Sequence, residues 1–354
     1  MRYCGGRETK PAGVALTQKR FGRGVPVILA VLLTVMMAAR LAQAAELNTP
    51  PPDIVALYTA GSYSRAAEAL QAAVAQNPKD SSLYYWLGRC YFEIRDFNQS
   101  ISSWEHTVVL DPDRSEYHDW LGRAYGLKAD QSSHSNMASA LSLARRTHRE
   151  FETAVRLDAT NINAQRDLIA FMANAPSNLG GGEEHALEQI RALSAVDPVE
   201  GELALADLYA VRKKFEQANE EYLKILRSAP NRTEAYFEAA DYYRDRADSE
   251  HMEQAVEAAA KIAPSDRRLN YYQGVTLVLQ KKDAEVAEKD LLTYINTVPD
   301  NSEVPSHSSA FEWLGKLYEN EKKPELAGEQ YKAALALDPQ NKALREALKR
   351  LQKR

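Results

Sequence analysis

The chain of 354 residues carries 44 Lys and Arg against 49 Asp and Glu, and 45% of its residues are hydrophobic, a composition that excludes an intrinsically disordered chain. The charge is uneven, with a net +6 over residues 1–44 and −11 over the remainder. Because phosphate contacts need clustered Lys and Arg, the acidic remainder argues against a nucleic-acid partner.

Residues 1–44 have the organisation of a secretory signal peptide. A positively charged start precedes an apolar run at 25–39, and small residues end the segment, so we expect cleavage between Ala44 and Ala45. The apolar run is 15 residues long, whereas a membrane-spanning helix needs about 20. We therefore expect an exported protein, in the periplasm or secreted. The alternative is an uncleaved leader that anchors the chain in a membrane through residues 25–45.

A linker is expected at 45–52, because it ends in three consecutive prolines that favour an extended spacer. Beyond residue 53, one six-residue segment recurs: WLGRCY at 86–91, WLGRAY 34 residues later at 120–125, and WLGKLY at 313–318. A fixed period of this size predicts stacked helix pairs, in which each pair buries its apolar face against its neighbours. The glycine is small enough for the second helix of a pair to approach closely.

These segments resemble the tetratricopeptide repeat, whose period is 34 residues. The second helix of each repeat is marked by three side chains at i, i+4 and i+7, and eight copies follow over 53–341. The triplets are Ala66-Leu70-Ala73, Ser100-Trp104-Thr107, Thr147-Phe151-Ala154, Ala186-Ile190-Leu193, Ala218-Tyr222-Ile225, Met252-Val256-Ala259, Ala287-Leu291-Tyr294 and Ala327-Tyr331-Ala334. The resemblance implies an all-α, right-handed superhelical solenoid of helix-turn-helix repeats. A capping helix is expected at 342–354.

Three segments interrupt the repeats. We expect the 13 extra residues around 126–143 to form a polar surface loop in the third repeat, since insertions in repeat proteins map to loops. The glycine run at 180–182 precedes Glu183 and Glu184, which would repel a phosphate, so a flexible turn is favoured over a nucleotide site. The polar connection at 300–308 predicts a local bend.

The sequence contains no recognisable catalytic or metal-binding pattern. None of its seven histidines has a zinc-ligand spacing, and no nucleophile turn of the Gly-x-Ser-x-Gly type is present. We therefore expect no metal, no cofactor and no catalytic residue. His118 is expected to be packed and hydrogen-bonded, and His148 to pair with Glu152 along one helix.

The family resemblance implies that positions 2, 5, 9, 12 and 13 of each first helix face a groove that holds a peptide or partner protein. Positions 5 and 9 correspond to Tyr85, Arg89, Asp119, Arg123, Arg166, Asp207, Phe237 and Asp241. Because arginine offers a planar fork of donors, we expect an acidic segment of the partner to meet Arg89, Arg123 and Arg166. An apolar residue of the partner is expected on Tyr85 or Phe237. The alternative is that the groove charges pair with one another.

Two functions remain open from the sequence. The favoured one is a non-catalytic exported scaffold or adaptor that binds a protein or peptide of unknown identity. The alternative is an envelope enzyme, or its obligatory subunit, with a site built by loops. A pocket enclosing His118 or His134 with a carboxylate would favour the enzyme. A membrane is an expected partner only if the leader is retained.

Overall fold

The computed structural model describes residues 50–133, 135–228 and 231–352. Within these ranges the chain forms 17 α-helices, one short 3-10 helix and no strand. None of the described helices has both the length and the apolar character needed to cross a membrane. The predicted leader, its cleavage site at Ala44 and Ala45, and residues 45–49 of the expected linker lie outside the described residues.

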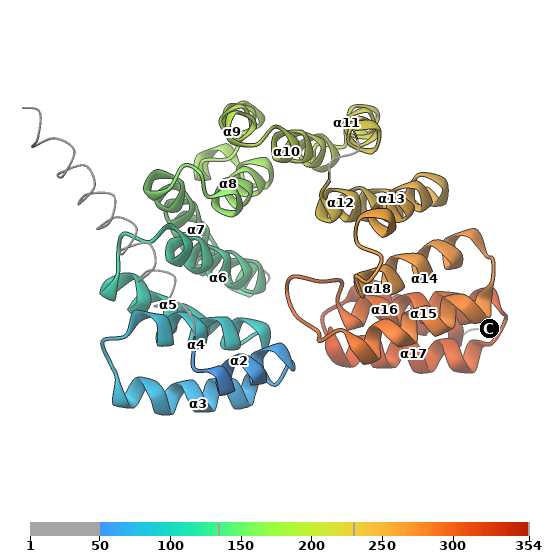
Figure 1. Ribbon diagram of the computed structural model, residues 1–354, viewed down its shortest axis with the longest axis horizontal. Helices are drawn as coiled ribbons and strands as arrows, with labels where there is room; N and C mark the ends of the chain where they lie inside the picture. The colour runs from blue at the N-terminus through green and yellow to red at the C-terminus, as the bar shows by residue number, and fades with distance from the viewer. Residues whose placement is uncertain (1–49, 134, 229–230, 353–354) are drawn as a thin grey trace, which may run out of the picture. The chain divides into compact units, whose positions relative to one another are not determined.

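The helices form eight consecutive pairs followed by one final helix (Figure 1). The first helices of the pairs are α2 (Pro52–Thr59), α4 (Ser81–Glu93), α6 (Ser115–Ser133), α8 (Ile162–Asn174), α10 (Pro198–Val211), α12 (Thr233–Asp245), α14 (Arg268–Gln280) and α16 (His307–Asn320). The second helices are α3 (Tyr63–Gln76), α5 (Phe97–Leu110), α7 (Met137–Leu157), α9 (Glu183–Val196), α11 (Phe215–Ser228), α13 (Ser249–Ile262), α15 (Ala284–Thr297) and α17 (Pro324–Leu337), and α18 (Lys342–Gln352) is last.

The two helices of each pair pack on each other, and the second helix of each pair packs on the first helix of the next. The first helices from α6 to α16 also pack on one another in order, and we call them the first-helix layer. The predicted all-α solenoid of helix pairs is therefore confirmed. After the last pair, α18 buries Leu344 and Ala347 in a cluster with Tyr331 and Ala334 of α17.

The recurring glycine allows the two helices of a pair to approach closely, as predicted. A Cβ added at Gly88 would lie 2.5 Å from Nε1 of Trp104. Trp104 is fully buried and donates a hydrogen bond of 3.1 Å from this nitrogen to the Tyr85 carbonyl. The same close contact occurs in two further repeats, between Gly122 and Phe151 and between Gly315 and Tyr331.

The turns inside the regular pairs share one backbone conformation. A single residue with positive φ ends the first helix: Gly61, Arg95, Lys213, Ala247 and Lys322 have φ between 54° and 70°. This left-handed residue lets the next amide groups satisfy carbonyls of the last helical turn. The seventh pair has one more residue in its turn, and there both Lys281 and Asp283 have positive φ.

The prediction of a surface loop at 126–143 is wrong. The extra residues lengthen both helices instead, so that α6 spans 19 residues and α7 spans 21. The segment contains no proline and a single glycine, so extending two existing helices satisfies its backbone groups at little cost in helix propensity. Asn136 begins α7 by accepting a hydrogen bond of 3.0 Å from the Ser139 amide.

The connection between α15 and α16, where a local bend was predicted, also contacts distant helices. Its residues 298–306, which we call the bridging loop, reach the first two helix pairs. The Tyr63 hydroxyl donates to the Asp300 carbonyl at 3.0 Å, and Arg89 pairs with Glu303 at 2.6 Å. These contacts join residues more than 200 positions apart in the sequence.

Candidate functional site

The first-helix layer of the middle repeats is hollowed by a cavity of about 550 Å³, which we call the central hollow. Its apolar lining includes Ile169 of α8 and Ala204 and Leu208 of α10. Its charged lining consists of Arg123, Arg166, Asp167, Glu200, Asp207, Glu234 and Glu238. These side chains project from α6, α8, α10 and α12, so four successive repeats contribute to one concavity.

A second cavity of about 470 Å³ continues the first, and we call it the adjacent hollow. It shares Glu234 and Glu238 with the central hollow. Side chains of α12 and α14 line it together with residues 302–306 of the bridging loop. The two hollows therefore extend along the same side of the first-helix layer, from α6 to α14.

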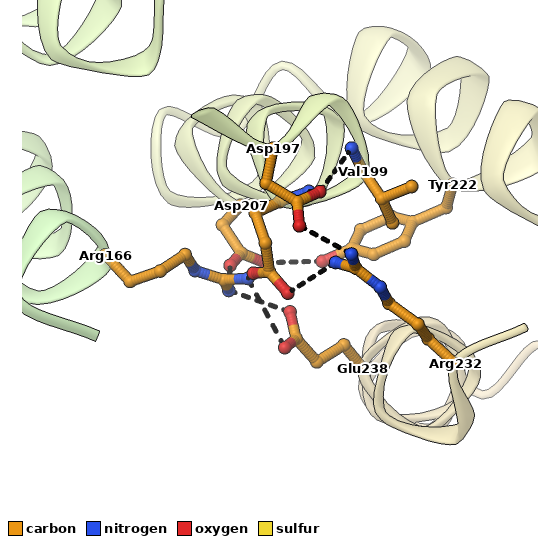
Figure 2. Close-up of polar contacts among 8 residues, drawn as sticks. Arg166, Asp197, Val199, Asp207, Tyr222, Arg232 and Glu238 are labelled. Carbon is orange, nitrogen blue, oxygen red and sulfur yellow. Dashed lines mark hydrogen bonds and ion pairs between the residues drawn. The ribbon is translucent and has the colours of Figure 1, made fainter. Parts of the chain in front are cut away.

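Arg166 is the centre of the charge network in the central hollow (Figure 2). Its guanidinium donates to Glu200 at 2.9 Å, to Asp207 at 2.8 Å and to Glu238 at 2.7 Å. Tyr222 donates its hydroxyl hydrogen bond to the second oxygen of Asp207. One cation of α8 thus holds carboxylates from α10 and α12 and ties three repeats together.

Three carboxylates around one guanidinium leave an excess of negative charge. Burial, the largest cause, raises the pKa of Glu238 to about 7; Arg166 lowers this pKa, and the nearby Asp207 and Glu200 raise it. Arg232 relieves part of the excess by pairing with Asp197 at 2.5 Å and with Glu200 at 3.4 Å. The raised pKa of Glu238 is therefore due chiefly to burial, and the neighbouring carboxylates add to it.

Arg123 of α6 is also saturated by carboxylates of this chain. It pairs with Asp119 at 3.2 Å and with Asp167 of α8, and its guanidinium lies 4.6 Å from the Trp120 ring centre. Burial, with a further contribution from Asp167, raises the pKa of Asp119 despite the neighbouring arginine. Asp119 is 2% exposed, so it belongs to the interior of the network and is not open to a ligand.

The two aromatic residues expected to contact a partner are buried in the core. Tyr85 is 3% exposed and donates its hydroxyl hydrogen bond to Glu116. Phe237 is 4% exposed, because the Tyr272 ring stacks on it at 4.5 Å and the Arg268 guanidinium lies 4.6 Å from its ring centre. The structure therefore assigns both rings to packing between repeats.

Arg89 differs from the other two arginines. Its side chain is 11% exposed and pairs with Glu303 of the bridging loop at 2.6 Å. It also donates to the Tyr58 hydroxyl at 3.0 Å and lies 4.0 Å from the Trp120 ring centre. In this structure Arg89, Arg123 and Arg166 therefore pair with carboxylates of the chain itself. This is the alternative that the sequence left open for the groove charges.

The lining of the two hollows is acidic overall. It includes seven carboxylates, from Asp167, Glu200, Asp207, Glu234, Glu238, Asp241 and Glu303, against four guanidiniums, from Arg123, Arg166, Arg244 and Arg268. Each of these arginines is paired within the chain. Arg89 and Arg232 do not line the hollows but pair with Glu303 and Glu200, so seven carboxylates face six guanidiniums and the remaining charge is negative.

Several residues that line the two hollows were not predicted from the sequence to be site residues. Glu200 and Glu234 occupy position 2 of their repeats, a position that the family resemblance implies faces the groove, so the sequence contained a signal for them. Asp167 and Glu238 occupy position 6, which the resemblance does not single out. Glu303 lies in a connection and has no repeat position at all.

His118 and His148, two histidines singled out in the sequence, are paired within the chain. Nδ1 of His118 lies 2.7 Å from the Glu150 carboxylate, and Nε2 lies 2.9 Å from the Pro112 carbonyl. Burial lowers the pKa of His118, but these two hydrogen bonds outweigh it and raise the pKa overall. His118 is thus packed and hydrogen-bonded as predicted, His148 pairs with Glu152 at 3.5 Å, and His134 lies outside the described residues. Among the described residues, no group of three or more His, Cys, Asp or Glu side chains is placed to hold a metal ion.

Fold and site together define a helical repeat protein with a charged, hollowed first-helix layer. Residues 54–114 and 308–341 each match a sequence model of the tetratricopeptide repeat. Two segments of the chain, toward the two ends of the described part, thus match tetratricopeptide repeats.

Among solved structures, the chain is similar to a tetratricopeptide-repeat protein from Parabacteroides merdae, at 15% identity and a TM-score of 0.46 over 77% of this chain and 98% of that one. It is also similar to a thermophilic tetratricopeptide-repeat protein from Thermus thermophilus, at 21% identity and a TM-score of 0.43 over 53% and 94%. A third is YrrB, described as having an unusual peptide-binding site, at 16% identity and a TM-score of 0.34 over 61% and 99%. No curated protein matches the chain.

Proposed function

We propose that this protein is a non-catalytic scaffold that binds a segment of a partner protein in the central and adjacent hollows. The observation that supports this is the pair of contiguous concavities, about 550 and 470 Å³, built by successive first helices. Their apolar lining offers contact area, and the charged side chains around it offer orientation. This combination is typical of binding sites.

The partner segment is proposed to carry a Lys or Arg side chain. An acidic segment at Arg123 or Arg166 would have to displace two or three carboxylates that these arginines already hold. A cation instead meets the unbalanced negative charge beside Glu238, where it would also favour ionisation of that carboxyl. We therefore replace the acidic ligand expected at Arg123 and Arg166 with a basic one.

The test begins with affinity capture of the partner from cells that make the protein. The double variant Glu234→Gln with Glu238→Gln should weaken binding of the captured partner about tenfold, roughly 1.4 kcal/mol. The salt dependence of binding should flatten as well. The matched control is Glu216→Gln, an exposed carboxylate on α11 in the other layer. Equal affinity of the double variant and the control would refute the proposed site.

We also propose that the protein is exported and that its leader is removed after Ala44. The charged start, the short apolar run and the small residues before Ala45 support this. Intact-mass measurement of the native protein decides the question. A mass that includes residues 1–44, found in the membrane fraction, would instead support an anchor at residues 25–45.

A further inference from the structure

The bridging loop fastens two parts of the chain that a repeat stack does not otherwise join. In a solenoid each repeat contacts its neighbours along the chain. Here Ser302 donates from its amide and its hydroxyl to Glu93 at 2.8 and 2.9 Å, and a Cβ on Gly61 would lie 3.3 Å from Pro299. With the Tyr63–Asp300 and Arg89–Glu303 contacts, the loop holds the first two repeats from a connection between the seventh and eighth.

The ion pair in this contact is asymmetric. The Arg89 side chain is 11% exposed and lies among aromatic rings, whereas the Glu303 side chain is 61% exposed. Among the described residues, Glu303 is the one carboxylate paired with Arg89, whereas Arg123 pairs with two and Arg166 with three. Nε of Arg89 is buried and has no hydrogen-bond partner there. A nearly buried guanidinium therefore depends on an anion that the chain supplies from an exposed loop.

We propose that Arg89, with Tyr58 and Trp120 around it, is a carboxylate-binding site that Glu303 occupies from within the chain. An Asp or Glu side chain of a partner protein replaces Glu303 there and releases the bridging loop from the first two repeats. The exchange is balanced, because one carboxylate replaces another at the same guanidinium. The exposed Glu303 regains most of its hydration when it leaves, while Arg89 is never left unpaired.

Release of the loop also changes the adjacent hollow. Ser302, Glu303, Val304 and Pro305 line that cavity in the fastened state. A carboxylate bound at Arg89 thus widens access to a surface formed by α12 and α14, and binding at one place is coupled to binding at the other. This site is distinct from the one in the proposed function, since Arg89, Tyr58 and Trp120 line neither hollow and the site takes a ligand group of opposite charge.

The test measures the separation of the two fastened parts in the full chain. Nitroxide labels are placed at the exposed positions Glu68 of α3 and Glu329 of α17 as cysteine substitutions, in a Cys4→Ser background. Cys90 is buried and stays unlabelled. Electron double resonance then gives the distance distribution. Glu303→Gln should reduce the fastened population roughly fivefold, and Glu325→Gln, an exposed carboxylate on α17, should leave it unchanged.

The ligand probe is a synthetic peptide with the sequence of residues 299–306, blocked at both ends and added at millimolar concentration. It should shift the distances of the unmodified chain in the direction that Glu303→Gln does. The same peptide with asparagine in place of its aspartate and glutamine in place of its glutamate should have no effect. Two results overturn the proposal: unchanged distances in Glu303→Gln, or equal effects of the two peptides. If Arg89→Gln retains its helical circular dichroism, it should not respond to either peptide, and a response would likewise overturn the site.

Discussion

Replacing Arg166 by methionine tests whether one cation holds three repeats together. The guanidinium lies 2.9, 2.8 and 2.7 Å from Glu200, Asp207 and Glu238. Methionine retains much of the packing of the arginine stem but removes the charge. The three carboxylates are then left facing one another without their shared counter-ion.

The magnitude follows from the burial of the four groups. Breaking a buried ion pair by removing one partner costs about 3–5 kcal/mol. Arg166 is 21% exposed, but its carboxylate partners are 17% to 45% exposed, so water recovers part of the loss. We expect the free energy of unfolding to fall by about 2 kcal/mol at pH 8.

The loss should shrink as the pH falls. Burial already raises the pKa of Glu238 to about 7 against the lowering effect of Arg166, and removal of Arg166 raises it further. The folded state then binds a proton that the unfolded state, with a carboxyl pKa of about 4.3, does not. Stability is therefore lost as the pH rises between these two values, and we expect the variant to lose less than about 1 kcal/mol at pH 5.

The assay is urea unfolding followed by circular dichroism at pH 5 and pH 8, with hydrogen exchange of α8, α10 and α12 as a local measure. Arg149→Met is the control, because Arg149 is an exposed arginine on α7. The control should change the free energy of unfolding by less than about 0.5 kcal/mol. An Arg166 variant that loses the same amount at both pH values, or no more than the control, would refute the reasoning.

Gly88→Ala should cost about 2 kcal/mol in urea unfolding, because its Cβ would overlap the fully buried Trp104. The matched change Gly126→Ala should be neutral or stabilising, since its Cβ would meet its nearest neighbour at an ordinary 3.6 Å. Ala247→Gly should raise the melting temperature, with a gain of about 0.5–1 kcal/mol, because the exposed residue 247 has φ of 54°; a lower temperature would contradict this. Glu238→Gln should stabilise the folded protein by about 1 kcal/mol at pH 8 and by little at pH 5, because it removes a partly screened carboxylate whose pKa is raised. Urea unfolding at both pH values measures this difference.

The repeat architecture could be predicted from the sequence because it depends on contacts between residues close in the chain. The small and large side chains of each second helix, and the glycine of each WLG segment, lie within one helix pair. Of the 24 side chains in the eight predicted triplets, all but Ala73 are buried. The lack of proline at 126–143 is compatible with helix, whereas the general rule that insertions in repeat proteins form loops predicts the opposite.

Which charged residues form ion pairs with one another is decided by the tertiary structure. Position 9 of a repeat places Arg89 and Arg123 on the same face of their helices. Arg89 nevertheless pairs with a single, exposed carboxylate, whereas Arg123 pairs with two carboxylates. The more distant partner of Arg123, Asp167, lies 44 positions away, and the partner of Arg89, Glu303, lies 214 positions away. Repeat periodicity specifies which face a side chain occupies, because that face is set by the helix itself. It does not specify which charges meet across it, because this depends on how successive repeats and the bridging loop come together in space.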